Sequence, residues 1–197
     1  MKQKTVALVQ CALFAALTGV LSQVSIPIGP VPLNLATFSV LLAGSVLGAR
    51  YGAVSQAIFT LLGVVGLPVF AGMKGGAAVL AGPTGGYIIG YIATAWLVGL
   101  LARQFGKSCS RLAVFMVAGM LLCYTFGTAW FLVLTKMEVR QALAICVFPF
   151  LIGDAVKVAA AALVAPRLYQ TLSKNGLINP NLQKKPVEIH FSKFNGN

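Results

Sequence analysis

The stretch GDAVKVAAAALVAP, from Gly153 to Pro166, is almost wholly aliphatic and is typical of a helix in a nonpolar environment. The rest of the chain has the same character, because 58% of its 197 residues are hydrophobic and only 9% are charged. A soluble domain carries roughly a quarter charged residues. The apolar runs are continuous rather than alternating, which indicates membrane helices and not a β-barrel. The sequence therefore predicts an all-α integral membrane protein.

Six apolar runs are candidate membrane helices. They cover about residues 5–24, 35–49, 51–65, 83–102, 112–134 and 141–166. The second and third are shorter than the roughly 20 residues that cross a bilayer, so we expect them to be tilted or to form a helical hairpin. We therefore predict a six-transmembrane-helix bundle over residues 1–166, followed by a cytoplasmic basic tail over residues 167–197.

The basic residues are unevenly divided between the two sides of this predicted bundle. Eleven lie on the side of both termini, and three lie on the other side: Lys74, Lys136 and Arg140. Because Lys and Arg are enriched in cytoplasmic loops, this division predicts that both termini are cytoplasmic. The net charge of +12 is dispersed between apolar runs, which argues against a nucleic-acid partner.

Few residues could catalyse a reaction or hold a metal. The four cysteines form no CxxC pair, and the only histidine, His190, lies in the predicted tail. The nucleotide-binding pattern GxxxxGK[ST] is absent. Asp154 is the only carboxylate within a predicted membrane segment, which leaves no set of residues for nucleophilic catalysis. We therefore expect neither an enzyme nor a metal or cofactor site.

Asp154 and Lys157 are the two charged residues of the opening stretch. They are three residues apart, so a helix places them on one face and within reach of each other. Burying either charge alone in a membrane costs roughly 2.5–3.5 kcal/mol, and pairing lowers that cost. The pair either packs the bundle or binds a ligand. In a binding site Asp154 would accept from an N–H group, and Lys157 would donate to a carbonyl or a carboxylate.

Two predicted segments carry stripes of small residues. The fourth segment has Gly82, Gly86 and Gly90, extended by Thr94. This stripe permits either close helix packing or the close approach of a ligand to the backbone. The free N–H groups at the start of the same helix could also attract an anion. In the first segment, Ala12 and Ala16 form a second small-residue face, suited to close contact with another helix.

Two loops on the predicted outer side are rich in proline and glycine. They span residues 22–34 and 66–87. Irregular backbone at membrane depth is tolerated only where it is buried in protein or lines a cavity. We therefore expect both loops to be ordered. Lys74 in the second loop is either a solvated charge or a group that attracts an anionic solute.

Four motifs occur in order along the chain: PVPLNLATFSVLLAGSVLGARYG (residues 30–52), GLPVFAGMKGG (66–76), AGPTGGYIIGY (81–91) and GDAVK (153–157). Together they resemble the BioY family, the biotin-specific substrate-capture subunits, or S components, of energy-coupling-factor (ECF) transporters. Members of that family read close to VPxTLQT where this chain reads VPLNLAT. Asn34 and Ala36 thus replace a threonine and a glutamine, and of these two only Asn34 can form side-chain hydrogen bonds.

The resemblance implies a high-affinity biotin-binding subunit in a bacterial cytoplasmic membrane that captures biotin from the outer side and needs no cofactor. It implies as partners a transmembrane coupling protein, docked at Ala12 and Ala16, and cytoplasmic ATPases. The implied biotin-binding residues are Asn34, Thr37, Phe70, Thr84, Gly86, Tyr87, Asp154 and Lys157. A stand-alone biotin carrier or facilitator without ATPase partners is the alternative, because the sequence does not show whether the protein depends on partners.

Overall fold

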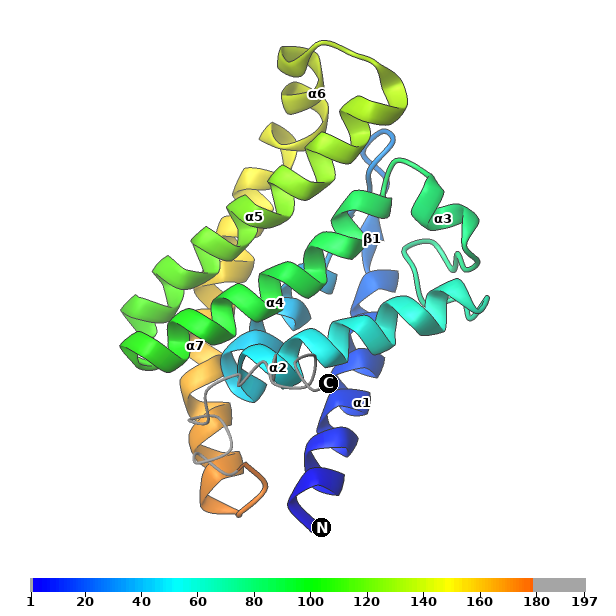
Figure 1. The fold of residues 1–197 in the computed structure, drawn as a ribbon. Coiled ribbons are helices and arrows are strands. Elements are labelled where there is room, and N and C mark those ends of the chain that lie inside the picture. Colours follow the sequence, from blue (N-terminus) through cyan, green and yellow to red (C-terminus); the bar gives the residue numbers. More distant parts are fainter. Residues whose placement is uncertain (1, 179–197) are drawn as a thin grey trace, which may run out of the picture.

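The computed structural model describes residues 2–178. The remaining residues include His190 and most of the predicted basic tail, which therefore lies largely outside the described part. Long helices dominate the fold (Figure 1). In chain order the elements are α1 (Lys2–Gln23), β1 (Ser25–Ile26), β2 (Leu33–Asn34), α2 (Ala36–Val64), α3 (Ala78–Ala81), α4 (Gly85–Phe105), α5 (Cys109–Thr135), α6 (Val139–Cys146), the 3-10 turn η1 (Phe148–Phe150) and α7 (Leu151–Lys174).

The predicted count of six spans is confirmed only in part. Within residues 2–178, five helical spans are long and apolar enough to cross a membrane. The predicted segments 35–49 and 51–65 belong to one such span, α2, which is broken at Gly48 with φ 82° and ψ 175°. Glycine adopts this conformation without a steric penalty, so the chain can bend sharply there while the helical ladder resumes beyond it.

The last predicted segment also differs from the observed helices. Its first part forms the short α6, and the chain then turns through η1, where Pro149 lacks an N–H donor and restricts the preceding residue. α7 continues through Pro166 to Lys174, so residues 167–174 of the predicted tail are helical. The ammonium of Lys107, in the α4–α5 connection, lies 3.5 Å from the ring centroid of Tyr169 in this extension.

Small residues bring α2, α4 and α5 unusually close together. A Cβ at Gly44 of α2 would lie 2.5 Å from the Ala95 carbonyl oxygen of α4. A Cβ at Gly86 would lie 2.3 Å from the Cβ of Trp130 on α5. Neither distance is possible for a real side chain, so glycine is required for these helices to pack as they do. The glycine stripe of the fourth predicted segment therefore serves helix packing along α5.

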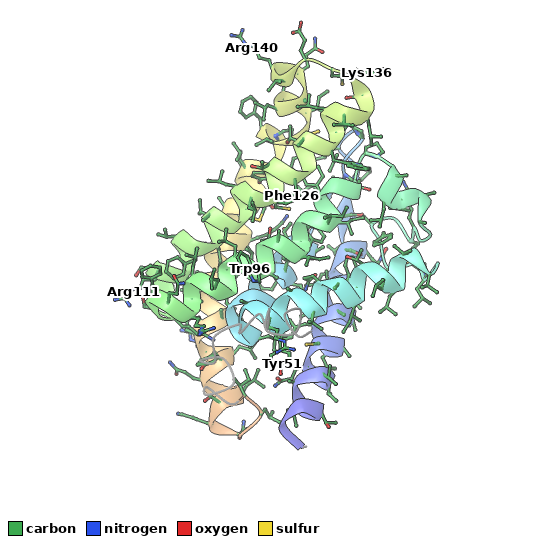
Figure 2. The ribbon with its side chains drawn as sticks, in the orientation of Figure 1. Tyr51, Trp96, Arg111, Phe126, Lys136 and Arg140 are labelled. Atoms are coloured by element: carbon green, nitrogen blue, oxygen red, sulfur yellow. The ribbon has the colours of Figure 1, made fainter. Side chains whose placement is uncertain are left out.

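Gly90 and Thr94 of that stripe lie in the same α4–α5 contact, whereas Gly82 precedes α4 and faces Val79 of α3. Gly90 faces Phe126 and Cys123, and Thr94 donates a 3.0 Å hydrogen bond to the Gly119 carbonyl. Charged residues lie at the two ends of this helix pair. Figure 2 shows Arg111 at one end of α5, and Lys136 with Arg140 at the other, beside α6.

Both proline- and glycine-rich loops are ordered, as expected. The first forms a two-stranded antiparallel hairpin in which Ser25 pairs with Asn34 and Ile26 pairs with Leu33. The second includes an antiparallel bridge between Phe70 and Lys74, followed by the short helix α3. Both lie near the C-terminal end of α1 (Figure 1), where they cover one end of the bundle.

Candidate functional site

A cavity lies between the helices and is closed partly by the two ordered loops. Its walls come from α2, α4, α5 and α7, with the β1–β2 hairpin and the 66–76 loop at its edges. Among the predicted site residues, those that line it are Asn34, Thr37, Phe70, Thr84, Tyr87, Asp154 and Lys157. The structure thus brings residues more than a hundred positions apart into one chamber.

Asp154 and Lys157 form a buried ion pair at the α7 wall of the cavity. Lys157 Nζ lies 2.7 Å from Asp154 Oδ1, and the two residues are only 7% and 6% exposed, respectively. The ammonium also donates to the Asn34 carbonyl oxygen at 2.6 Å and to Thr37 Oγ1 at 3.3 Å. An ammonium has three N–H donors, so all of them are engaged. The positions three residues apart on α7 make this pairing possible, as the sequence predicts.

The carboxylate of Asp154 is equally well partnered. Its Oδ1 also accepts from Thr37 Oγ1 at 3.5 Å, and its Oδ2 accepts a short hydrogen bond from the Tyr124 hydroxyl. Buried charges are tolerated when they are paired and hydrogen-bonded in this way. The arrangement is electrically neutral as a whole. Asp154 lines the cavity, and its Oδ2 accepts one hydrogen bond among the described residues, which leaves it able to accept another.

Asn34 takes part in the site through its backbone. Its carbonyl oxygen accepts from Lys157, and its side-chain Oδ1 accepts from the backbone N–H of Ala36 at the start of α2. Asn34 thus satisfies a free N–H group of the α2 N-terminus and fixes the hairpin against that helix. This engagement occupies one of the side-chain atoms that the sequence assigns to ligand binding.

Phe70 forms part of the apolar wall. It is 3% exposed, and its ring meets that of Phe59 edge-on with centroids 5.5 Å apart. The ring lies so close to Gly63 that a Cβ there would be 2.0 Å from the Phe70 Cζ. Gly63 therefore has to be glycine for the ring to reach the cavity. Edge-to-face packing then fixes the ring as a rigid part of the wall.

The turn at the start of α4 reaches the cavity only in part. Thr84 and Tyr87 line it, and the Tyr87 hydroxyl donates to the Cys146 carbonyl oxygen at 3.1 Å. Gly86 does not line the cavity, because the position that a Cβ would occupy lies against Trp130 of α5. The N–H groups of Gly85 and Tyr87 donate to carbonyl oxygens of this turn, so they are not free for an anion.

Several residues that line the cavity are not among the predicted site residues. The most important is Tyr124, which hydrogen-bonds Asp154 although the two are 30 positions apart. A tyrosine within an apolar membrane segment needs a partner for its hydroxyl, and that requirement is the signal that could have marked it. Apolar residues that also line the cavity are Phe59, Tyr91, Met120, Cys123 and Phe150. Nothing in their local sequence separates them from ordinary core residues.

The described residues contain no group of three or more His, Cys, Asp or Glu side chains that could hold a metal ion. The four cysteines are free thiols, and three of them are buried. On α1, Ala12 and Ala16 are exposed, whereas Ala15 between them is buried against the bundle. The small-residue face of α1 therefore points away from the cavity and the core.

Comparisons with known proteins agree on one family. The BioY family model matches residues 1–174. The biotin transporter BioY of Thermotoga maritima is 44% identical over 161 residues, which cover 82% of this chain and 94% of that protein. A probable biotin transporter BioY of Pyrococcus horikoshii is 44% identical over 168 residues, covering 85% of this chain and 98% of that protein. A crystal structure of the S component for biotin from an ECF-type ABC transporter superposes with a TM-score of 0.80 at 29% identity, covering 86% and 93% of the two chains.

Proposed function

This chain belongs to the BioY family, and we propose that it takes up biotin by capturing it in the described cavity as the S component of an ECF-type importer. The observation that supports the site most directly is the buried, neutral pair of Asp154 and Lys157 in an otherwise largely apolar chamber. A chamber with apolar walls and a few fixed polar groups is typical of small-molecule sites.

The polar groups of the site suit the ureido ring of biotin, which carries N–H donors beside a carbonyl acceptor. One ureido N–H would donate to Asp154 Oδ2, which accepts only from Tyr124 among the described residues. The ureido carbonyl would accept from Lys157 in place of Thr37, because the 3.3 Å bond to Thr37 is the longest of the three that the ammonium makes. The sulfur-containing ring and the aliphatic chain would pack on the Phe59, Phe70 and Tyr91 wall.

Energy for transport would come from partner proteins, since this chain carries no nucleotide-binding motif. In the proposed complex, a transmembrane coupling protein docks on the exposed Ala12 and Ala16 of α1, and cytoplasmic ATPases bind that protein. Both termini face the cytoplasm, as the excess of basic residues on their side supports. Co-purification of the tagged chain with two ATPases distinguishes this importer from a stand-alone carrier, which would purify without them.

Equilibrium binding of labelled biotin to the detergent-purified protein tests the proposed site. We expect saturable binding to the wild type and a loss of roughly a hundredfold or more in affinity for Asp154→Ala and for Lys157→Ala. Each substitution removes a polar group that the proposed ureido ring would bind, and truncating one partner of a buried hydrogen-bonded pair costs about 2–5 kcal/mol in binding. Lys136→Met removes a charge outside the cavity and serves as the control. Wild-type affinity in both cavity variants would disprove the site.

A further inference from the structure

Three charged side chains line the cavity within the described chain, and they do not balance. Asp154 and Lys157 neutralise each other at 2.7 Å. Lys74 is the third, and it has no ion-pair partner among the described residues. The cavity therefore carries one net positive charge, and that charge comes from Lys74. A chamber with a single unbalanced cation is suited to a ligand with a single negative charge.

Lys157 is a poor partner for that negative charge. In the proposed complex its three N–H donors reach Asp154, the Asn34 carbonyl and the ureido carbonyl, which leaves none for a carboxylate. A ligand carboxylate bound there would also lie beside the Asp154 carboxylate in a buried setting. Two carboxylates that share a buried site repel each other, and one of them is driven to take up a proton. The anionic end of a ligand is therefore directed away from the ion pair.

Lys74 is held at the edge of the cavity by the loop that also supplies Phe70. The backbone N–H of Phe70 donates to the Lys74 carbonyl at 3.0 Å, and the reverse bond is 3.2 Å long. Gln23, at the end of α1, donates to the Phe70 carbonyl at 3.2 Å and accepts from the Met73 N–H at 2.9 Å. The loop is thus fixed at both ends.

The two ends of this loop differ in exposure. Phe70 is buried, whereas Lys74 is exposed although it lines the same cavity. One short loop therefore provides an apolar wall inside the chamber and a cation where the chamber opens. The N–H groups of Gly85 and Tyr87 at the α4 N-terminus, which could have competed for an anion, already donate to backbone carbonyls.

We propose that the Lys74 ammonium binds the carboxylate of the captured ligand and so selects free biotin over biotin whose carboxylate is bound in an amide. This inference rests on the proposed function and adds the orientation of the ligand to it. The ureido ring lies inward at Asp154 and Lys157, and the carboxylate lies at the opening. An amide-linked biotin has no charge for Lys74 to bind.

Binding of biotin and of biotinamide, which differ in the carboxylate alone, tests the proposal. We expect the wild type to prefer biotin by about tenfold, as for a charge-assisted hydrogen bond weakened by exposure. Lys74→Met should bind the two ligands equally, and Lys74→Arg should keep the preference. The preference should also shrink at high ionic strength in the wild type, because salt screens exposed charges. Lys136→Met lowers the net charge equally and should behave as the wild type.

Three results would overturn the proposal, and they can be told apart. If Lys74→Met binds biotin and still prefers it over biotinamide, the carboxylate is bound elsewhere, and only the role of Lys74 is wrong. If the wild type binds neither ligand, the proposed function itself fails, and the role of Lys74 fails with it. Equal binding of both ligands by the wild type would also refute the role of Lys74 while leaving biotin capture intact.

Discussion

Two buried polar clusters in this bundle show how burial of polar groups serves different ends. The ion-pair cluster comprises Asp154, Lys157, Thr37 and Tyr124, and all four line the cavity. The hydroxyl cluster comprises Thr18 of α1 with Ser39, Ser55 and Gln56 of α2, and none of these four lines it. The four residues of the hydroxyl cluster are almost completely inaccessible to solvent.

The hydrogen bonds of the hydroxyl cluster show that it joins two helices. Thr18 donates to the Phe14 carbonyl oxygen at 2.8 Å, so its single proton is used and Ser39 must be the donor in their 2.9 Å contact. Gln56 then donates to both Thr18 and Ser55. The cluster therefore ties α1 to the parts of α2 on either side of its break at Gly48. It contains no charged group and faces other helices, whereas the ion-pair cluster contains two opposite charges and faces a chamber.

Substitutions in the ion pair give the largest expected effects, on stability when one charge is removed and on biotin binding in every case. Asp154→Asn or Lys157→Met alone leaves one buried charge unpaired and should lower the free energy of unfolding by about 3–5 kcal/mol. The double variant removes both charges, so we expect its unfolding temperature to return close to that of the wild type. Biotin binding should stay lost in all three variants. Thermal unfolding and biotin binding in detergent measure the two effects separately, and tight binding by the double variant would make the pair purely structural.

The sequence predicts the parts of this fold that depend on composition. Continuous apolar runs identify the long helices, because a bilayer-spanning helix needs about 20 apolar residues wherever it lies in the bundle. The breaks within these helices are less evident from the sequence. Gly48 breaks α2, yet Gly44 in the same helix only brings α2 close to α4, and Gly52 packs against Gly44 across the break. Local sequence does not separate a glycine that bends a helix from one that packs it, since the difference lies in the neighbouring helix.

The same limit applies to the site. Asp154 and Lys157 are evident because charge is rare in an apolar segment and their spacing pairs them locally. Tyr124 is not among the predicted site residues and Gly86 does not line the cavity, because their environments depend on contacts with distant segments. The hydroxyl of Tyr124 on α5 meets Asp154 on α7, and Gly86 on α4 meets Trp130 on α5. Their roles follow from helix packing, which no local pattern specifies.

Tyr124→Phe, in the ion-pair cluster, should have an intermediate effect on stability. The change leaves Asp154 Oδ2 without its donor, so we expect the unliganded protein to lose about 1.5–3 kcal/mol of stability, as for a hydrogen bond to a charged group. A ureido N–H can supply the missing donor in the proposed complex. Biotin should therefore raise the unfolding temperature of this variant more than that of the wild type.

Tyr51→Phe is the matched control for that measurement. Tyr51 belongs to α2 (Figure 2) and does not line the cavity, so loss of its hydroxyl should leave the biotin-induced shift unchanged. An equal shift in Tyr124→Phe and the wild type would mean that the ligand does not reach Asp154 Oδ2.

Thr18→Val tests the hydroxyl cluster and should have the smallest effect on stability. The change preserves shape but leaves donors of Ser39 and Gln56 without their acceptor, which should lower stability by about 1–2 kcal/mol. Biotin affinity and the biotin-induced shift should equal those of the wild type, because no ligand group can reach this cluster to replace the lost bond. Thr125→Val, at an exposed position of α5, controls for the change of side chain. If Thr18→Val weakens biotin binding as strongly as Asp154→Asn, the α1–α2 contact helps to shape the cavity, and the two clusters act as one.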